Sequence, residues 1–453
     1  MPQQKPAAVV VRMELRLNAR ALEHIERFFF VLFVFLALSL FLNEWGQMSD
    51  FDAADYLQVW QKVQWFRPLP GVRDLFYSFH PPLTYFLSRI PLLVFGDPVV
   101  SSQFLSLLSV ISSVALLRST LRYVGILGSV SGMCFLYITT SLPLFVFLTT
   151  APPPDALSLF WSILILHLSV RLFWHPRYPS KREIVAPLFL SIVFAAGLLT
   201  KFTGVLNFGI PVTVIVVRRD PNQIKRSLLM AFASSLLGAV IVGPFYYTHY
   251  FLTEGVLFPN NLEWLQRDVL QVERPKRDEH PVQFIGHMLR FPREPFWGMG
   301  TPVVRDSFLH SVWFHLWKRD PLIGTQSRLG TFVSDVYMSF FFGVCLLGTM
   351  LFLLFQSRRS QPWNDLGWIL IGITLTFCIA LLAFGYRYPV WKWGVFKSKY
   401  IAIAFIWIPY CSALIVHHIL AVRSWQGWGE RIQAILLLLV LAFMCVNYLG
   451  PIY

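Results

Sequence analysis

Three carboxylates lie close together in the segment Ser49-Asp50-Phe51-Asp52-Ala53-Ala54-Asp55-Tyr56. The segment directly follows an apolar run, so we expect these acids just beyond a membrane surface. Loss of hydration beside an apolar boundary raises the pKa of a carboxyl group, and such a group can act as a general base toward an alcohol. The alternative is a helix N-terminus, where acidic residues bind free amide groups and favour the helix macrodipole.

Two further ionisable residues, His80 and Asp155, lie where apolar runs begin. His80 precedes two prolines, which fix the backbone and break any helix, so it is expected at the start of segment 83–96. A purely structural histidine fits this position equally well. Asp155 follows three prolines and opens an apolar run. An acid there can cap the helix, yet an ionisable group at a membrane boundary is costly enough to be a functional candidate.

Five cations complete the set of residues that could act chemically. Lys201 is the only charged residue between Glu183 and Arg218. It is either a lysine whose stem extends to the interface or a cation that holds an anion where lipid meets water. Residues 386–400 hold four more cations among aromatic residues: Arg387, Lys392, Lys397 and Lys399. An interfacial belt explains the aromatic residues, and a phosphate-bearing lipid headgroup explains the cations.

The elements that position these residues are membrane helices. Of 453 residues, 56% are hydrophobic and 14% charged, against roughly 45–50% and about 25% in soluble domains. This composition excludes a soluble enzyme, a disordered chain and a disulfide scaffold. Apolar runs of about 17–22 residues recur along the chain, and a membrane-crossing helix needs roughly 20. The net charge of +14 does not indicate nucleic-acid binding, because Lys and Arg fall mostly in short runs between apolar segments.

Eleven spans are predicted, at 28–43, 101–117, 124–147, 155–170, 185–200, 202–217, 228–248, 335–355, 366–385, 400–421 and 432–450. Segment 83–96 is too short to cross and is expected to lie on the surface. With this topology the short loops on one side hold 14 Lys and Arg, and those on the other side hold 5. The positive-inside rule then places the N-terminus in the cytoplasm and all the candidate residues on the extracytoplasmic face.

The predicted fold class is therefore an all-α polytopic membrane protein of about 11 transmembrane helices. Residues 1–27 form a cytoplasmic N-terminal segment, and 28–450 form the membrane domain. Two loops, 44–100 and 249–334, are expected to build an extracytoplasmic cap. Tryptophans in the second loop are expected to stack on sugar rings of an acceptor: Trp264, Trp297, Trp313 and Trp317. Histidines in the same loop lack the spacing of a metal site: His280, His287, His310 and His315.

Taken in order, these motifs resemble a known family. They are Asp52-Ala-Ala-Asp-Tyr56, His80-Pro-Pro-Leu83, Pro154-Asp155-Ala-Leu157, Leu199-Thr-Lys201 and Lys397-Ser-Lys399-Tyr400. The set is similar to the integral-membrane glycosyltransferases of the GT-C class, in the branch of the protein O-mannosyltransferases and the lipid A aminoarabinose transferases. The resemblance implies a GT-C-like transmembrane domain. It also implies inverting transfer of a sugar from a dolichyl- or undecaprenyl-phosphate carrier to an acceptor.

The resemblance also implies roles for individual residues. In relatives the acid matching Asp52 is the catalytic base, and a second acid matching Asp155 lies beside it. Predicted donor-binding residues are His80, Lys201, Arg387, Lys397, Lys399 and Tyr400, with Asp55 and Tyr56 as supporting residues. Relatives usually carry Glu where this chain has Ala53, which disfavours a metal ion bridging the acids but leaves a divalent metal open.

Two other functions stay open. One is a flippase or transporter of lipid-linked sugars, although such proteins usually show related halves that meet at the bilayer midplane. The other is a glycan polymerase or ligase that uses a diphosphate-linked donor. The expected partners are the polyprenyl-phosphate sugar, membrane lipid and a protein, lipid or glycan acceptor, with no nucleic acid. No Asn-x-Ser/Thr sequon occurs, which favours a bacterial inner membrane over the endoplasmic reticulum.

Overall fold

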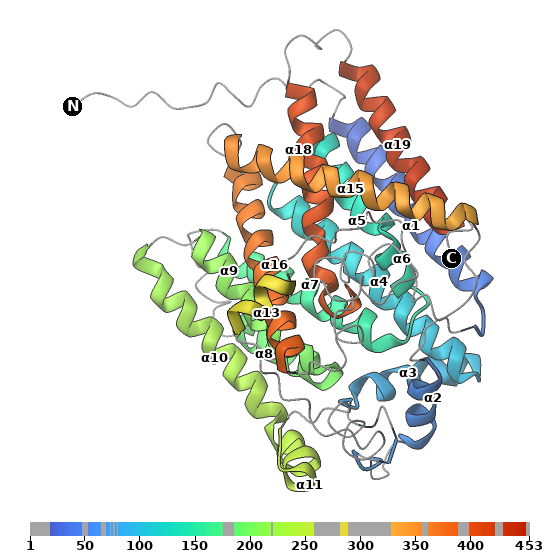
Figure 1. The fold of residues 1–453 in the computed structure, drawn as a ribbon, viewed down its shortest axis with the longest axis vertical. Helices are drawn as coiled ribbons and strands as arrows, with labels where there is room; N and C mark the ends of the chain where they lie inside the picture. The colour runs from blue at the N-terminus through green and yellow to red at the C-terminus, as the bar shows by residue number, and fades with distance from the viewer. Residues whose placement is uncertain are drawn as a thin grey trace.

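A computed structural model describes most of the chain. The described residues are 19–47, 53–64, 69–72, 74–75, 78, 80–174, 185–218, 221–257, 281–288, 328–355, 361–387, 398–421 and 429–449. Within these ranges all regular structure is helical, which confirms the predicted all-α fold class (Figure 1). Seven of the described helices are long and apolar enough to cross a membrane, and five shorter apolar helices accompany them. The protein is therefore an integral membrane protein.

In chain order the described helices are α1 (Ala19–Asn43), α2 (Ala53–Lys62), α3 (Leu83–Phe95), α4 (Pro98–Tyr123), α5 (Val130–Ser141), α6 (Pro143–Leu148), α7 (Pro153–Phe173), α8 (Val185–Thr200), η1 (Phe202–Phe208), α9 (Gly209–Arg218), α10 (Pro221–Phe245), η2 (Tyr246–Phe251), α11 (Leu252–Glu254), α13 (Pro281–Met288), α15 (Arg328–Phe355), α16 (Gln361–Arg387), η7 (Ser398–Ile406), α18 (Trp407–Ala421) and α19 (Gly429–Leu449). The segments η1 and η7 are 3₁₀-helices, and η2 is a π-helix.

Each of the eleven predicted spans overlaps one of these helices or a pair of consecutive ones. Most helices begin or end several residues away from the predicted bounds, and two spans differ further. The span expected at 124–147 is interrupted at Leu142, whose extended backbone (ψ 133°) precedes Pro143, because a proline disfavours helical geometry in the residue before it. The span expected at 228–248 continues as η2 and α11 to Glu254.

Contacts at the two ends of α7 show that residues 185–218 form a hairpin. Lys201, where the chain turns, contacts Asp155 near the start of α7. Arg218 lies at the end of α9, and its Nη2 donates at 3.0 Å to the carbonyl oxygen of Trp174, just beyond the end of α7. The chain therefore reaches one end of the bundle in α8 and returns along α7 in η1 and α9. We call the end that carries Asp155 and Lys201 the site end.

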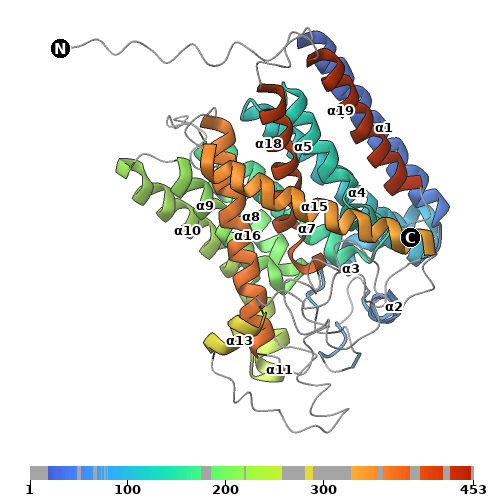
Figure 2. The same ribbon diagram turned by 45° about the horizontal axis from the view of Figure 1, so that its top comes forward.

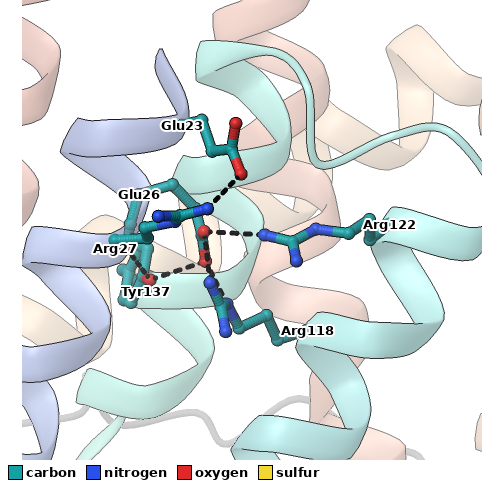
Figure 3. A network of polar contacts seen from close by, with 6 residues as sticks. All are labelled: Glu23, Glu26, Arg27, Arg118, Arg122 and Tyr137. Atoms are coloured by element: carbon teal, nitrogen blue, oxygen red, sulfur yellow. Dashed lines mark hydrogen bonds and ion pairs between the residues drawn. The ribbon is translucent and has the colours of Figure 1, made fainter. Parts of the chain in front are cut away.

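The opposite end is held by a buried carboxylate on α1. Glu26 is 3% exposed and accepts hydrogen bonds from Arg118 Nη2 at 2.6 Å and Arg122 Nη2 at 3.0 Å (Figure 3). The Tyr137 hydroxyl donates to the Glu26 carbonyl oxygen at 2.8 Å. These contacts join α1 to α4 and α5. Figure 2 also shows α19 alongside α1, in agreement with their packing contacts.

The predicted surface segment 83–96 forms helix α3, which packs on α2. The hydroxyl of Ser88 on α3 accepts from Trp60 Nε1 at 2.8 Å and lies 3.2 Å from the Tyr56 hydroxyl of α2. The rings of Tyr56 and Tyr85 stack with centroids 5.0 Å apart. Burial raises the pKa of the Tyr56 hydroxyl well above its usual value, so this contact is neutral across the physiological range. Helix α3 also contacts α4, α7 and α8, which places the α2–α3 unit at the site end.

Candidate active site

One buried carboxylate and two buried lysines meet at the site end. Lys201 Nζ forms an ion pair with Asp155 Oδ1, and Lys399 Nζ lies 3.4 Å from Asp155 Oδ2. The side chains of both lysines are 8% exposed and that of Asp155 is 7% exposed. They come from positions 155, 201 and 399, on three different elements. We call these three residues the Asp155 cluster.

Prolines set the position of Asp155. Pro152 precedes α7 with an extended backbone (ψ 137°), and Pro153 and Pro154 form the first two residues of the helix. Proline has a fixed φ that suits the start of a helix and carries no N–H. The carboxylate of the third residue therefore has no N–H to accept from at these two positions, and it contacts the two ammonium groups instead. Capping, the structural alternative for Asp155, does not describe these contacts.

A break between two helices sets the position of Lys201. Its backbone is extended (φ −158°, ψ 146°) between the end of α8 and the start of η1. The amide of Lys201 donates to the Gly197 carbonyl at 3.1 Å, and its own carbonyl accepts from the Gly204 amide at 2.9 Å. Just before it, the Thr200 hydroxyl accepts from Trp161 Nε1 at 2.8 Å. Trp161 lies on α7, the helix that carries Asp155.

Lys399 lies in the 3₁₀-helix η7, which precedes α18. Residue Ile401 has non-helical dihedrals (φ −130°, ψ 33°), so the chain bends directly after the lysine. The segment is tied to α16 by the Thr374 hydroxyl, which donates to the Ala404 carbonyl at 3.0 Å. Contacts of η7 with α6 and α7 bring Lys399 beside Asp155.

Four of the remaining predicted residues fall into two groups. Asp52 and Lys397 lie outside the described residues. Two others are described as backbone only: Arg387 is the last residue of α16, and Tyr400 is in η7. Neither group can be placed against the Asp155 cluster from side-chain contacts.

The acidic segment and the histidine motif flank the α2–α3 unit at the site end. Asp55 lies in the first turn of α2, in agreement with the alternative that this acidic segment begins a helix. Tyr56 is buried against α3 and joins the two helices. His80 is half-buried and precedes α3 by three residues, as its two prolines predict. Because α3 contacts α7 and α8, these residues lie on the same end of the bundle as the Asp155 cluster.

The charges of the cluster define its chemistry. A carboxylate between two ammonium groups gives these three side chains a formal charge of +1 together. Buried charges are stable only when they are paired and hydrogen-bonded, so Asp155 keeps the two lysines close together where water is largely excluded. Such a pair of ammonium groups suits an anion that approaches from the membrane surface. In the described part of the chain, no group of three His, Cys, Asp or Glu side chains could hold a metal ion.

Sequence reasoning found Thr200 and the glycines 197 and 204 only as neighbours of Lys201, and it missed Trp161. Trp161 lies in an uncharged apolar segment, where a sequence offers no signal for a functional contact. The tryptophans expected to face the acceptor all lie outside the described residues, as do His280, His310 and His315.

The architecture and the cluster define the protein as a polytopic α-helical membrane protein with a buried acid–lysine site at one end. No protein-family model and no curated protein sequence matches the chain. Its fold is similar to the crystal structure of ArnT from Cupriavidus metallidurans in the apo state, with 13% sequence identity, a TM-score of 0.41, and 86% of this chain and 77% of that chain covered. It is also similar to ArnT from the same organism bound to undecaprenyl phosphate, with 15% identity, a TM-score of 0.41, and coverage of 85% and 76%. Likeness at this level does not define an activity, which has to be argued from the site.

Proposed function

We propose that the protein transfers a sugar from a polyprenyl-phosphate carrier to an acceptor hydroxyl by inverting displacement at the extracytoplasmic membrane face. The observation that carries this proposal is the Asp155 cluster, in which two buried lysines converge on one buried carboxylate at the end of a membrane bundle. Cations held in place before the reaction stabilise a leaving group that gains negative charge. A carrier phosphate is such a leaving group.

The proposed reaction is a single displacement. The acceptor oxygen forms a bond to the anomeric carbon while Asp52 takes the hydroxyl proton. The bond from the anomeric carbon to the phosphate oxygen breaks, and the carrier phosphate leaves with the electron pair. Lys201 and Lys399 stabilise the departing phosphate, and Asp155 holds the two lysines in place. We assign His80, Arg387, Lys397 and Tyr400 to the donor headgroup.

The exposed face of α3 supports a lipid-linked donor. Three apolar side chains on this helix are largely exposed, Ile90 at 55%, Leu93 at 88% and Val94 at 79%. A long prenyl chain is most stable in the bilayer, and a helix with an exposed apolar face offers a surface for it. Because α3 contacts α7 and α8, a tail beside α3 would leave the phosphate within reach of the Asp155 cluster.

The distribution of arginines supports the proposed orientation. The end of the bundle opposite the site holds Arg118 and Arg122 at the end of α4, Arg171 near the end of α7 and Arg218 at the end of α9. Lys and Arg that flank membrane helices favour the cytoplasmic side. We therefore propose that the site end faces the extracytoplasmic space. A bacterial inner membrane is favoured over the endoplasmic reticulum as the location of the protein.

Reconstitution tests the proposal. Proteoliposomes receive a radiolabelled sugar on undecaprenyl or dolichyl phosphate, and a hydroxyl-rich peptide, a lipid and a glycan are offered as separate acceptors. We expect covalent transfer by the wild type and none by Asp52→Asn. Removal of one stabilising cation by Lys201→Ala or Lys399→Ala should lower the rate about 10²–10³-fold. The control is Lys62→Ala on α2, an exposed lysine at the same end.

Three outcomes would overturn parts of this proposal. Movement of unchanged carrier lipid across the bilayer without covalent transfer would identify a flippase. Transfer only from a diphosphate-linked donor would identify a polymerase or ligase. A near-normal rate in Asp52→Asn, with the helical circular dichroism unchanged, would remove Asp52 from the base role.

A further inference from the structure

We propose that Thr200, Trp161 and Gly204 are positioning residues that hold Lys201 against Asp155. This inference rests on the proposed function for its kinetic consequence and on the described contacts for its geometry. Lys201 lies in an extended link between α8 and η1. Helical hydrogen bonding alone therefore does not fix the direction in which its side chain leaves the backbone. One contact before the lysine and one after it restrict this link.

The first contact precedes Lys201. The Thr200 hydroxyl is buried, donates to the Ala196 carbonyl at 2.8 Å and accepts from Trp161 Nε1 at 2.8 Å. Trp161 lies six residues after Asp155 on α7. The helix that carries the carboxylate therefore also holds the residue next to the lysine. Loss of this hydrogen bond would remove one link between α7 and the residue that precedes Lys201.

The second contact follows Lys201. A Cβ atom at Gly204 would lie 2.5 Å from the carbonyl carbon and oxygen of Gly197 and 2.8 Å from the Leu198 amide nitrogen. These are backbone atoms of α8 that cannot move without a change in the helix itself. The first turn of η1 thus packs directly on the last turns of α8, an approach that only glycine permits. Any side chain at position 204 would push η1 away and carry Lys201 with it.

Gly197 provides a matched comparison at the same junction. A Cβ atom there would lie 3.3 Å from Asn207 Nδ2 and 3.7 Å from Trp161 Cβ, both of which belong to side chains. The contact at 3.3 Å is with the end of a side chain and not with the backbone, so Gly197→Ala should disturb Lys201 much less than Gly204→Ala. Gly243 on α10 has no atom within 4 Å of its added Cβ and provides a neutral control.

The geometric test does not need enzymatic activity. Purified protein in lipid nanodiscs is treated with acetic anhydride, and acetylation of Lys201 relative to exposed Lys62 is followed by mass spectrometry. We expect slow modification of Lys201 in the wild type, and an increase of at least about fivefold in Thr200→Val, Trp161→Phe and Gly204→Ala. Unchanged labelling in Thr200→Val and Trp161→Phe would overturn the inference, even if Gly204→Ala fails to fold.

The kinetic test separates a positioning role from a structural one. Thr200→Val should lower kcat about tenfold in the wild-type background and less than twofold in the Lys201→Ala background, because residues that act as a unit are not additive. Equal losses in both backgrounds would overturn the inference. If the wild type transfers no sugar, the proposed function fails while the acetylation experiment still decides the positioning.

Discussion

Asp155→Asn is the sharpest single test of the site, because the substitution keeps the shape of the side chain and removes its charge. The formal charge of the Asp155 cluster then rises from +1 to +2, with both ammonium groups still 8% exposed. At an effective dielectric constant of about 20, two unit charges 3.4 Å apart interact by about 5 kcal/mol. Breaking a buried pair by removal of one partner typically costs about 3–5 kcal/mol.

We therefore expect Asp155→Asn to lower the free energy of unfolding by about 3 kcal/mol. The assay is unfolding in mixed micelles as the fraction of SDS is raised, followed by far-ultraviolet circular dichroism. The double variant Asp155→Asn/Lys399→Met returns the formal charge of the cluster to +1 and should recover about half of the loss. Asp97→Asn at the start of α4 is the control, since asparagine caps a helix as well as aspartate.

Two results would refute this reasoning. Wild-type stability in Asp155→Asn would mean that the carboxylate does not compensate the two lysines. A double variant that is less stable than Asp155→Asn would mean that Lys399 contributes through packing and not through charge.

Three further predictions follow from contacts elsewhere in the fold. Glu26→Gln should lower the free energy of unfolding by about 3 kcal/mol, the low end for a buried pair, because its partner Arg122 is 54% exposed. The control Glu23→Gln removes a charge from an exposed pair and should change the free energy of unfolding little. Equal effects of the two substitutions in SDS unfolding would contradict this prediction. Tyr250→Phe should stabilise the protein by about 1 kcal/mol, since its buried hydroxyl has no hydrogen-bond partner among the described residues. Tyr246→Phe should destabilise the protein by a similar amount, because the Tyr246 hydroxyl donates to the Leu198 carbonyl at 2.7 Å. A lower melting temperature for Tyr250→Phe than for Tyr246→Phe would contradict both predictions. Leu93→Asp on the exposed face of α3 should raise the KM for a long-chain donor more than for a short-chain one, and an equal change for both donors would exclude α3 from the tail site.

The membrane helices could be predicted from sequence because bilayer thickness fixes their length and hydrocarbon selects their composition. The turn at Lys201 was predictable from the charges of the flanking loops, because a single crossing by 185–217 would place two loops of four cations each on opposite sides of the membrane. The interruption at Leu142 was not, because an apolar run of sufficient length hides a break that one proline introduces. The helical residues after position 248, in η2 and α11, were missed because the aromatic and polar residues there do not show the composition of a membrane span.

Contacts between helices were beyond the reach of sequence reasoning. The Trp161–Thr200 hydrogen bond joins residues 39 positions apart, and it depends on how far each helix is rotated about its axis. Hydropathy indicates that a helix crosses the membrane but not which side chains face each neighbour, because nearly every face of these helices is apolar. The same limit applies to Gly204, whose importance follows from a backbone approach and not from its chemistry.

The number of crossings explains why a site made of such distant residues was predictable at all. In the predicted topology four spans lie between Lys201 and Lys399, at 202–217, 228–248, 335–355 and 366–385, and four crossings return the chain to the membrane surface from which it left. The contact of Lys399 with Asp155 agrees with this even number. Both lysines therefore have to reach the same membrane surface, although 197 residues of sequence lie between positions 201 and 399. The number of crossings does not determine how the two lysines are placed laterally around one carboxylate. That placement depends on the prolines at the start of α7, the bend in η7 and the close packing at Gly204.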